Sequence, residues 1–333
     1  MQNLPLAELQ LWTVLIMKDS FGREIEYLRL SVTERCNLRC RYCMPAEGIC
    51  KKQHEEMLTE DEMILAVETA ASLGIRKVRI TGGEPLVKKN ILSICRRISE
   101  IDAIDELCLT TNGLLLPQYA LALRAAGVRR INLSLDTLRP DRYEHITRCG
   151  DLAQAKAGLE AALSAGFEKV KINTVLIGGF NQDEVADLAA LSVQYPVDVR
   201  FIELMPIQES DEFDAKAFLP VGIVPKILPQ LQKLPFDGKD VLLYRMPGGQ
   251  GNVGLISPLS QHFCGKCDRL RLTADGHIKP CLHSSQEIPI KGLSREEMEK
   301  AFVQAILAKP ACHGALSVTD RSEAGRNMNR IGG

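Results

Sequence analysis

The chain has 333 residues, of which 45% are hydrophobic and 25% charged, a globular composition that excludes collagen-like and largely disordered chains. Forty-one basic and forty-two acidic residues give a net charge of −1, so we expect no bulk electrostatic binding to nucleic acid or to a membrane surface. No apolar run approaches the ~20 residues of a membrane span, and no basic segment precedes the short apolar stretch 9–17, so we expect a cytoplasmic protein.

Short β-branched segments alternate with Ala- and Leu-rich amphipathic segments between residues 27 and 206. The six predicted strands are Tyr27–Val32, Lys77–Ile80, Glu106–Leu109, Arg130–Leu135, Lys169–Ile177 and Asp198–Leu204. Helices are predicted at Glu60–Leu73, after the N-cap Thr59, and at Asp151–Ala165, which ends at Gly166. Parallel strands need long crossovers, and no dinucleotide fingerprint follows the first strand. We therefore predict an α/β fold with an incomplete six-strand parallel, TIM-like (βα) barrel rather than a doubly wound sheet.

The pattern changes after Pro206, where prolines become frequent and helical repetition stops. Short strands are predicted at Val241–Tyr244, Val253–Ile256 and Leu270–Thr273, and a last helix at Arg295–Leu307 after the N-cap Ser294. We therefore divide the chain into an N-terminal extension (1–20), a partial barrel (21–206) and a smaller C-terminal α+β domain (207–333). The smaller domain is expected to pack against the barrel and close its open side.

Three cysteines follow the first strand directly, at the end of the barrel where such folds carry their chemistry. Cys36, Cys40 and Cys43 have C-x₃-C-x₂-C spacing. Three thiolates are one short of the usual four for a 4Fe-4S cluster or a closed zinc site, which leaves one coordination position open. The alternative is a set of packed or zinc-bound cysteines.

A second triad, Cys264, Cys267 and Cys281, lies in the predicted smaller domain and is also one ligand short. A nearby histidine would complete a zinc site here, so that alternative stays open; the candidates are His262, His277 and His283. Five further cysteines show no metal-binding spacing and are expected to be packing residues: Cys50, Cys95, Cys108, Cys149 and Cys312.

Several predicted strands contain cations, although strands buried on both faces should be nearly all apolar. These residues are Arg29, Lys77, Arg79, Lys171 and Arg200, with Arg269 and Arg271 in the C-terminal region. Taken singly, each cation is equally well explained as a residue at a strand end that faces solvent. Taken together, they predict a cationic cavity suited to a polyphosphate, in which paired arginines also donate to a purine.

The segment Cys36–Cys43 resembles the signature of the radical S-adenosylmethionine (SAM) superfamily. The resemblance implies that the three cysteines hold a 4Fe-4S cluster and that SAM binds the fourth iron. Thr81–Pro85, after the second strand, resembles the family's SAM-binding segment; its glycines allow close backbone approach, and Glu84 is suited to accept from the ammonium group of SAM.

The pairing of the two triads resembles the GTP 3′,8-cyclase family within this superfamily, from about Phe21 to the C-terminus. Matching segments include Phe21–Arg23, Tyr27–Thr33, Cys43–Pro45, Phe201–Pro206, Arg269–Thr273 and Ile331–Gly333. Glu34 and Asp268 differ from the commonest residues of the family at their positions, but neither is a ligand position. The resemblance implies a lyase of molybdenum cofactor (molybdopterin) biosynthesis: a 5′-deoxyadenosyl radical takes hydrogen from ribose C3′ of GTP, and C3′ attacks guanine C8. The implied product is (8S)-3′,8-cyclo-7,8-dihydroguanosine 5′-triphosphate, and the implied cofactors are SAM and two 4Fe-4S clusters.

The same resemblance assigns roles to individual residues. It implies that Tyr42, Gly83, Ser134 and Met205 bind SAM. It implies that GTP is bound by Arg29, Arg79, Thr110, Lys171 and the segment Arg269, Leu270 and Arg271, to which the strand pattern adds Lys77 and Arg200. Arg200 and Met205 fall on opposite faces of an ideal strand, so the strand must end or bend near Pro206.

The C-terminal Gly332 and Gly333 have two interpretations. Composition alone indicates a frayed end. The family resemblance instead implies that this double glycine reaches into the active site, where Arg269 and Arg271 also act, through a narrow channel between the barrel and the smaller domain, and we expect that arrangement mainly in the substrate-loaded enzyme.

The resemblance also implies partners: GTP as substrate, a flavodoxin or ferredoxin as reductant, cyclic pyranopterin monophosphate synthase as the enzyme that takes the product, and a second copy in a homodimer. Two other classes of function stay open. One is a zinc-stabilised binding module, and the other is a radical SAM enzyme that modifies peptides.

Overall fold

The computed structural model describes residues 18–49, 52–207, 215–235, 241–314 and 322–332. Within them, all strands join one curved sheet in the order β12-β11-β10-β1-β2-β3-β4-β5-β6-β9-β8-β7. Its six central strands are β1 (Tyr27–Ser31), β2 (Lys77–Thr81), β3 (Glu106–Thr111), β4 (Arg130–Ser134), β5 (Lys169–Leu176) and β6 (Val197–Glu203). Adjacent central strands are parallel, and each observed boundary lies within two residues of the prediction. The fold is a partial TIM-like barrel, as the alternating pattern predicted.

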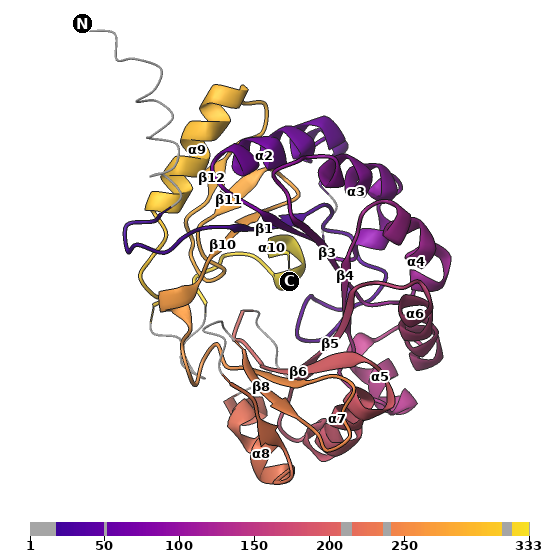
Figure 1. The fold of residues 1–333 in the computed structure, drawn as a ribbon. Helices are drawn as coiled ribbons and strands as arrows, with labels where there is room; N and C mark the ends of the chain where they lie inside the picture. Colours follow the sequence, from indigo (N-terminus) through magenta and orange to yellow (C-terminus); the bar gives the residue numbers. More distant parts are fainter. Residues whose placement is uncertain (1–17, 50–51, 208–214, 236–240, 315–321, 333) are drawn as a thin grey trace, which may run out of the picture.

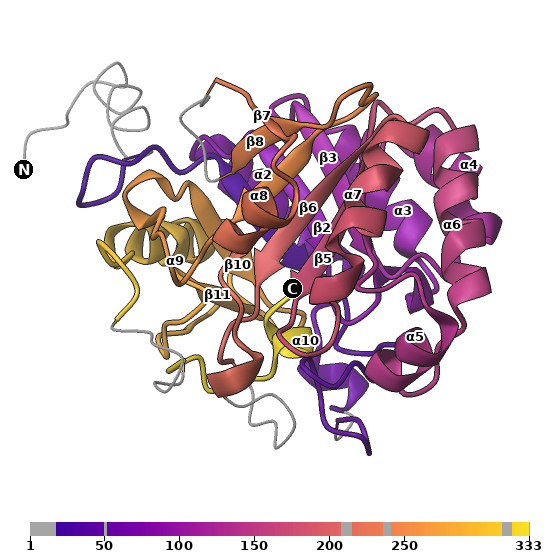
Figure 2. The ribbon, with the colours of Figure 1, turned by 90° about the horizontal axis from the view of Figure 1, so that it is seen from below.

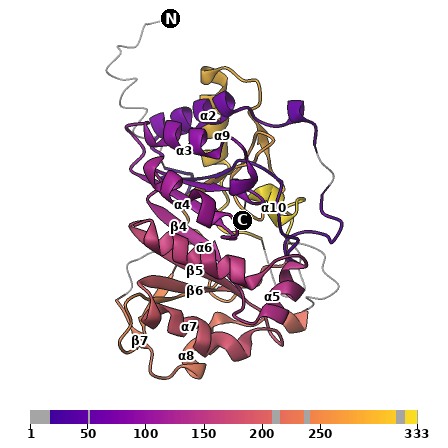
Figure 3. The ribbon, with the colours of Figure 1, turned by 90° about the vertical axis from the view of Figure 1, so that its right-hand side faces the viewer.

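The helices form a layer outside the curved sheet, so the sheet's concave side is left for the short C-terminal helix (Figure 1). They are α2 (Glu60–Ser72), α3 (Ile91–Ser99), α4 (Leu116–Ala125), α5 (Pro140–Thr147), α6 (Leu152–Ser164), α7 (Val185–Gln194), α8 (Val224–Ile227), α9 (Arg295–Leu307) and α10 (Met328–Ile331). Figure 3 shows α2, α3, α4 and α6 following one another in this outer layer. In Figure 2, α10 and α5 lie at the same end of the molecule.

The C-terminal region joins the sheet of the barrel. Its strands are β7 (Gln232–Lys233), β8 (Leu242–Arg245), β9 (Val253–Ile256), β10 (Arg269–Leu272), β11 (His277–Lys279) and β12 (Ile288–Pro289). Strand β10 pairs parallel with β1, and β9 pairs parallel with β6. An open six-strand barrel would leave the backbone groups of β1 and β6 unpaired, and these two strands satisfy them. One hydrophobic core spans both regions, so the division at residue 206 stays a prediction.

Strand alternation decides what faces the interior. In β1, Leu28 and Leu30 are fully buried beneath the helices, whereas Arg29 between them faces the concave side. In β2, Val78 and Ile80 are fully buried in the same way. The sheet therefore directs every second side chain of its central strands toward one interior space.

Two predicted helix starts are observed with their side-chain caps. The N-cap hydroxyl of Thr59 accepts from the N–H of Glu62, whose carboxylate accepts from the N–H of Thr59; Ser294 and Glu297 repeat this arrangement at α9. Helix α9 lies beside α2 on the outside of the sheet (Figure 1).

Candidate active site

A cavity of about 750 Å³ lies on the concave side of the sheet. Alternate residues of five central strands line it: Lys77, Arg79 and Thr81 of β2; Thr110 of β3; Arg130, Asn132 and Ser134 of β4; Lys171, Asn173 and Val175 of β5; and Asp198, Arg200 and Ile202 of β6. Arg29 of β1 joins them, as do all six cysteines of the two triads. The cavity therefore brings together residues that the sequence places more than two hundred positions apart.

The first triad lies on the loop after β1. The N–H of Leu38 donates to the sulfur of Cys36 at 3.3 Å, and the amide of Asn112 lies 3.9 Å from the same sulfur. Burial raises the pKa of Cys36 to about 11 and that of Cys43 to about 12, and it raises the pKa of Cys40 as well. Buried thiols ionise when cationic iron compensates their charge, and N–H donors to sulfur are typical of cluster ligands. This donor set fits a 4Fe-4S cluster held by three cysteines.

The second triad flanks β10 and β11 and lines the same cavity. Burial raises the pKa of Cys264, whereas at Cys267 the charges of Lys309 and Arg269 outweigh the effect of burial and lower the pKa. Lys309 also donates to the carbonyls of Arg269 (2.7 Å) and Pro280 (2.9 Å), so it links the triad to β10. Three thiols beside a buried cation fit an anionic iron-sulfur cluster here too.

The three histidines proposed as zinc ligands have other partners. Nδ1 of His262 lies 3.0 Å from Nε2 of His313, and Nδ1 of His283 lies 3.0 Å from the hydroxyl of Ser322. His277 faces Asp275 at 3.4 Å. Across the described ranges, no three His, Cys, Asp or Glu side chains converge to hold a single metal ion. The zinc alternative thus gains no support, whereas a cluster binds each thiolate through a different iron atom.

Each residue predicted to bind SAM lines the cavity. Ser134 ends β4, and β6 ends at Glu203, so Met205 follows the strand and shares the cavity with Arg200. The hydroxyl of Tyr42 donates to Asp136 at 2.7 Å. Burial raises the pKa of Asp136 to about 6, and the bond from Tyr42 opposes that shift.

The double glycine of the Thr81–Pro85 segment is required by protein packing. A Cβ on Gly83 would lie 2.3 Å from the carbonyl oxygen of Arg35, and one on Gly82 would lie 2.5 Å from that of Thr33. The predicted close approach therefore involves the chain's own backbone, in the loop that leads into the first triad. Binding of SAM at Gly83 stays a prediction.

Glu84 has more protein partners than the sequence suggested. It is 1% exposed, and its carboxylate accepts from the N–H of Leu86 (3.0 Å), the hydroxyl of Thr111 (2.7 Å) and the N–H of Asn112 (2.7 Å). Burial raises its pKa to about 7, although these bonds oppose the shift. Glu84 thus ties the loop after β2 to the loop after β3, and its contact with the ammonium of SAM stays a prediction.

The predicted cationic face lines the cavity. Burial, together with the charge of neighbouring arginines, lowers the pKa of Lys171 to about 7 and that of Arg271 to about 10. Burial and the charge of Arg271 also lower the pKa of Arg29. Among the described residues, Nη1 of Arg79 has no hydrogen-bond partner although it is buried. Crowded, buried cations of this kind are stabilised by a polyanionic ligand.

One predicted substrate residue faces elsewhere. The side chain of Leu270 is fully buried in the core and does not line the cavity, whereas its neighbours Arg269 and Arg271 do.

Sequence reasoning missed polar residues of the same face. Arg130, Asn132 and Asn173 line the cavity, and they share the strand face of residues that were selected. Two carboxylates also contact the cations: Glu106 pairs with Arg130 at 2.7 Å, and Asp198 lies 4.0 Å from Lys171. The period-two pattern that selected Lys77 and Arg79 was sufficient to select these residues too.

The C-terminal tail enters the interior of the barrel. Met328 and Asn329 line the cavity, and the side-chain amide of Asn329 donates to the carbonyl of Glu34 at 3.1 Å. Arg330 lies 3.4 Å from the carboxylate of Glu34. The carbonyl of Gly332 accepts from Arg271, while Gly333 lies outside the described residues.

The remaining cysteines divide into two classes. Cys95 and Cys108 are buried packing residues, as expected. Cys149 and Cys312 are exposed, so the expectation that they pack in the core was wrong; Cys50 lies outside the described residues.

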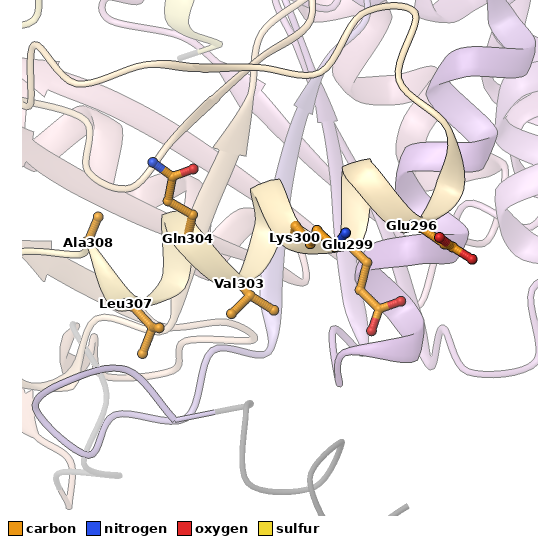
Figure 4. A pocket seen from close by; sticks show the side chains of 7 residues that line it. All are labelled: Glu296, Glu299, Lys300, Val303, Gln304, Leu307 and Ala308. Carbon is orange, nitrogen blue, oxygen red and sulfur yellow. The ribbon is translucent and has the colours of Figure 1, made fainter. Parts of the chain in front are cut away.

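A second depression lies on the outer surface of α9 (Figure 4). Its lining comes from one helix and its C-cap: Glu296, Glu299, Lys300, Val303, Gln304, Leu307 and Ala308. It is separate from both cysteine triads and from the cationic strands, so the interior cavity is the stronger candidate site.

Comparison with known proteins identifies two matching families and close sequence relatives. Residues 30–191 match the Radical SAM superfamily, and residues 197–314 match the family Molybdenum Cofactor Synthesis C. The GTP 3′,8-cyclase of Alkaliphilus oremlandii (strain OhILAs) is 47% identical over 321 residues, which cover 95% of this chain and 100% of that protein. The GTP 3′,8-cyclase of Pelotomaculum thermopropionicum (strain DSM 13744 / JCM 10971 / SI) is 48% identical over 329 residues, with the same coverage.

Among solved structures, Streptococcus suis SuiB superposes with a TM-score of 0.63 over 94% of this chain and 73% of that chain, at 15% identity. This likeness concerns the fold alone. None of the described helices is both long enough and apolar enough to cross a membrane.

Proposed function

The chain belongs to the GTP 3′,8-cyclase family of the radical SAM superfamily, and we propose that it catalyses the first step of molybdenum cofactor biosynthesis by joining ribose C3′ of GTP to guanine C8. It is a radical SAM enzyme whose family cofactors are a 4Fe-4S cluster and SAM. When bound, the cluster and SAM supply a 5′-deoxyadenosyl radical that takes hydrogen from C3′ of GTP.

The observation that carries the proposal is the shared cavity. One interior space of about 750 Å³ is lined by both cysteine triads and by cations from β1, β2, β5, β6 and β10. A zinc-stabilised module would not require cations from five strands around one cavity. A bound nucleoside triphosphate would, because its negative charges need compensation.

The chain's own residues bind and orient the substrate in this proposal. Arg79 of β2, Lys171 of β5 and Arg200 of β6 face the triphosphate, because they alternate with apolar residues that hold those strands in the core. Arg269 and Arg271 sit beside the second triad and donate to the guanine end. A substrate held at both ends keeps C3′ close to the first triad, which gives the proximity that catalysis requires.

We also propose two clusters rather than one. Both triads consist of three cysteines on the cavity wall, and each leaves one iron open: the first for SAM, the second for the guanine of GTP. Anaerobically reconstituted protein should then contain about eight iron atoms per chain.

We also propose that the enzyme works with an electron donor, a downstream enzyme and a second copy of itself. A reduced flavodoxin or ferredoxin would donate the electron, because SAM cleavage consumes one. Cyclic pyranopterin monophosphate synthase would take up the product, and the active form would be a homodimer. We place the reaction in the cytoplasm, where GTP and reduced electron carriers are available.

The decisive experiment is an anaerobic incubation with SAM, dithionite and GTP, followed by mass spectrometry and nuclear magnetic resonance of the product. We expect SAM cleavage that depends on GTP and a product with a C3′–C8 bond. The same incubation with ATP is the control for base recognition. SAM cleavage that ignores GTP but responds to a peptide would instead assign a peptide-modifying activity.

A further inference from the structure

The end of helix α5 is bound tightly to the loop that carries the first cysteine triad. The N–H of Arg39 donates to the carbonyl of Thr147 at 3.0 Å, and the N–H of Arg41 donates to that of Ile146 at 2.9 Å. These bonds fix the backbone of the cluster loop to a segment more than one hundred residues away in sequence.

Arg148, the C-cap of α5, has a strained backbone. Its φ of 64° is left-handed, and it is the one residue other than glycine with a positive φ in the described part of the chain. A glycine at this C-cap would take the same conformation without strain. The arginine in this position adds a side chain whose contacts glycine would lack.

The guanidinium of Arg148 binds both ends of the Cys40–Cys43 segment. Its Nη1 donates to the carbonyl of Arg39 at 2.8 Å and to the carbonyl of Met44 at 3.1 Å. Between these residues the chain makes a tight turn, because the N–H groups of Cys43 and Met44 both donate to the carbonyl of Cys40 at 2.9 and 3.1 Å. One side chain thus closes the turn that carries two of the three thiols.

We propose that Arg148 is a positioning residue for the first 4Fe-4S cluster. It acts through the carbonyls of Arg39 and Met44, and it holds the thiols of Cys40 and Cys43 at the spacing that one cluster needs. It also draws two carbonyl oxygens to itself and adds a positive charge near the cluster, which favours the reduced state. The inference depends on the first cluster and on no property of GTP, so it can fail while the proposed function stands.

The test compares iron release and cluster spectra in the anaerobically reconstituted holoenzyme. Arg148→Gly removes the guanidinium and relieves the backbone strain. We expect the iron of the first cluster to be lost to a chelator about tenfold faster than in wild type, while the second cluster is retained. The reduction potential of the first cluster should fall, and the change that SAM produces in its electron paramagnetic resonance spectrum should weaken.

Two further variants accompany Arg148→Gly, one at the same position and one as a control. Arg148→Lys keeps a cation and should restore part of the wild-type behaviour. Arg124→Ala is the matched control, because Arg124 also lies near a helix end and donates to a distant carbonyl, that of Gly166 at 3.1 Å, but on α4. It should behave as wild type in every measurement.

Two results would overturn the proposal. One is wild-type iron release and an unchanged response to SAM in Arg148→Gly; the other is equal loss of both clusters, which would indicate general loosening. If the Arg148→Gly apoprotein does not fold, the same measurements on Arg148→Met decide, since methionine keeps the length of the side chain but has no donor.

Discussion

The carbonyl of Gly332 accepts a hydrogen bond from the guanidinium of Arg271, 61 residues earlier in the chain. The bond is buried, and it places the last described residue of the chain against β10. A Cβ on Gly332 would lie 2.5 Å from the hydroxyl of Thr81 and 3.2 Å from Cβ of Ser31, so the tail is in close contact with β1 and β2 as well. Gly332 thus contacts three strands whose cations line the cavity.

This contact predicts that Gly332→Ala inactivates the enzyme without loss of iron. The added methyl group collides with Thr81, and the left-handed φ of 85° is unfavourable for alanine. A displacement of about 1 Å in the wall is expected to lower GTP turnover by about 100-fold. The matched control is Gly166→Ala, which has a similar φ of 72° but no atom within 4 Å of the new Cβ. Equal turnover in both variants would show that the tail has no role in the site.

Variants of Arg269 and Arg271 should differ from variants of Lys309 in their effect on iron content. Arg271→Ala removes a buried donor from the substrate end of the cavity. The transition state should lose about 1.5–3 kcal/mol of stabilisation, so turnover should fall about 10- to 150-fold with iron content unchanged. Arg269→Ala should behave alike, because its side chain lines the same wall.

Lys309→Met is the contrasting variant. Its ammonium contacts the second triad and links it to β10, so this change should release about half of the iron, and turnover should fall together with the loss of the second cluster. Iron analysis beside a turnover assay distinguishes the two classes. Loss of iron from Arg271→Ala would reassign that arginine to the support of the cluster.

A buried carboxylate beside the tail should control stability at acid pH. Burial alone would raise the pKa of Asp275, but hydrogen bonds from His277, Lys52, Thr273 and Arg326 outweigh it and hold the pKa well below its usual range. The stabilisation that follows is therefore present above about pH 5 and is lost as the pH falls below about 4.

Asp275→Asn should lower the free energy of unfolding by about 3 kcal/mol at neutral pH, because it removes the buried negative charge that pairs with Lys52 and Arg326. The difference from wild type should shrink as the pH falls. Asp183→Asn is the control: Asp183 also pairs with an arginine, Arg142, but is 46% exposed at its side chain, and its loss should cost under about 1 kcal/mol. Denaturant titrations at pH 7 and at about pH 3 measure both, because the contribution of Asp275 is lost below about pH 4; a difference that is the same at both pH values would contradict the assignment.

The sequence predicted what depends on local pattern. The cations of β2 and the thiols of Cys36, Cys40 and Cys43 were found because alternation and spacing are properties of neighbouring residues. The pairing of β9 with β6 and of β10 with β1 was not predicted, because which strand completes a sheet edge is decided by contacts between distant segments. The left-handed backbone of Arg148 has no sequence signal, since the residue usual in that conformation is glycine.

Lys171 is expected to take up a proton when the substrate binds. Burial, together with the neighbouring Arg200, lowers the pKa of Lys171 to about 7, against a smaller opposing effect of Asp198. At pH 8 most of the free enzyme therefore carries neutral Lys171, whereas a bound triphosphate favours the ammonium form and raises the pKa. Binding of GTP at pH 8 should take up a proton, and the affinity for GTP should fall toward tenfold per pH unit above about 8.

Calorimetric titrations of the anaerobic holoenzyme in two buffers of different ionisation enthalpy measure this proton uptake. Lys171→Arg, which stays protonated throughout, should bind GTP with no such uptake, and identical binding enthalpies for wild type in both buffers would exclude Lys171 as the phosphate-binding cation.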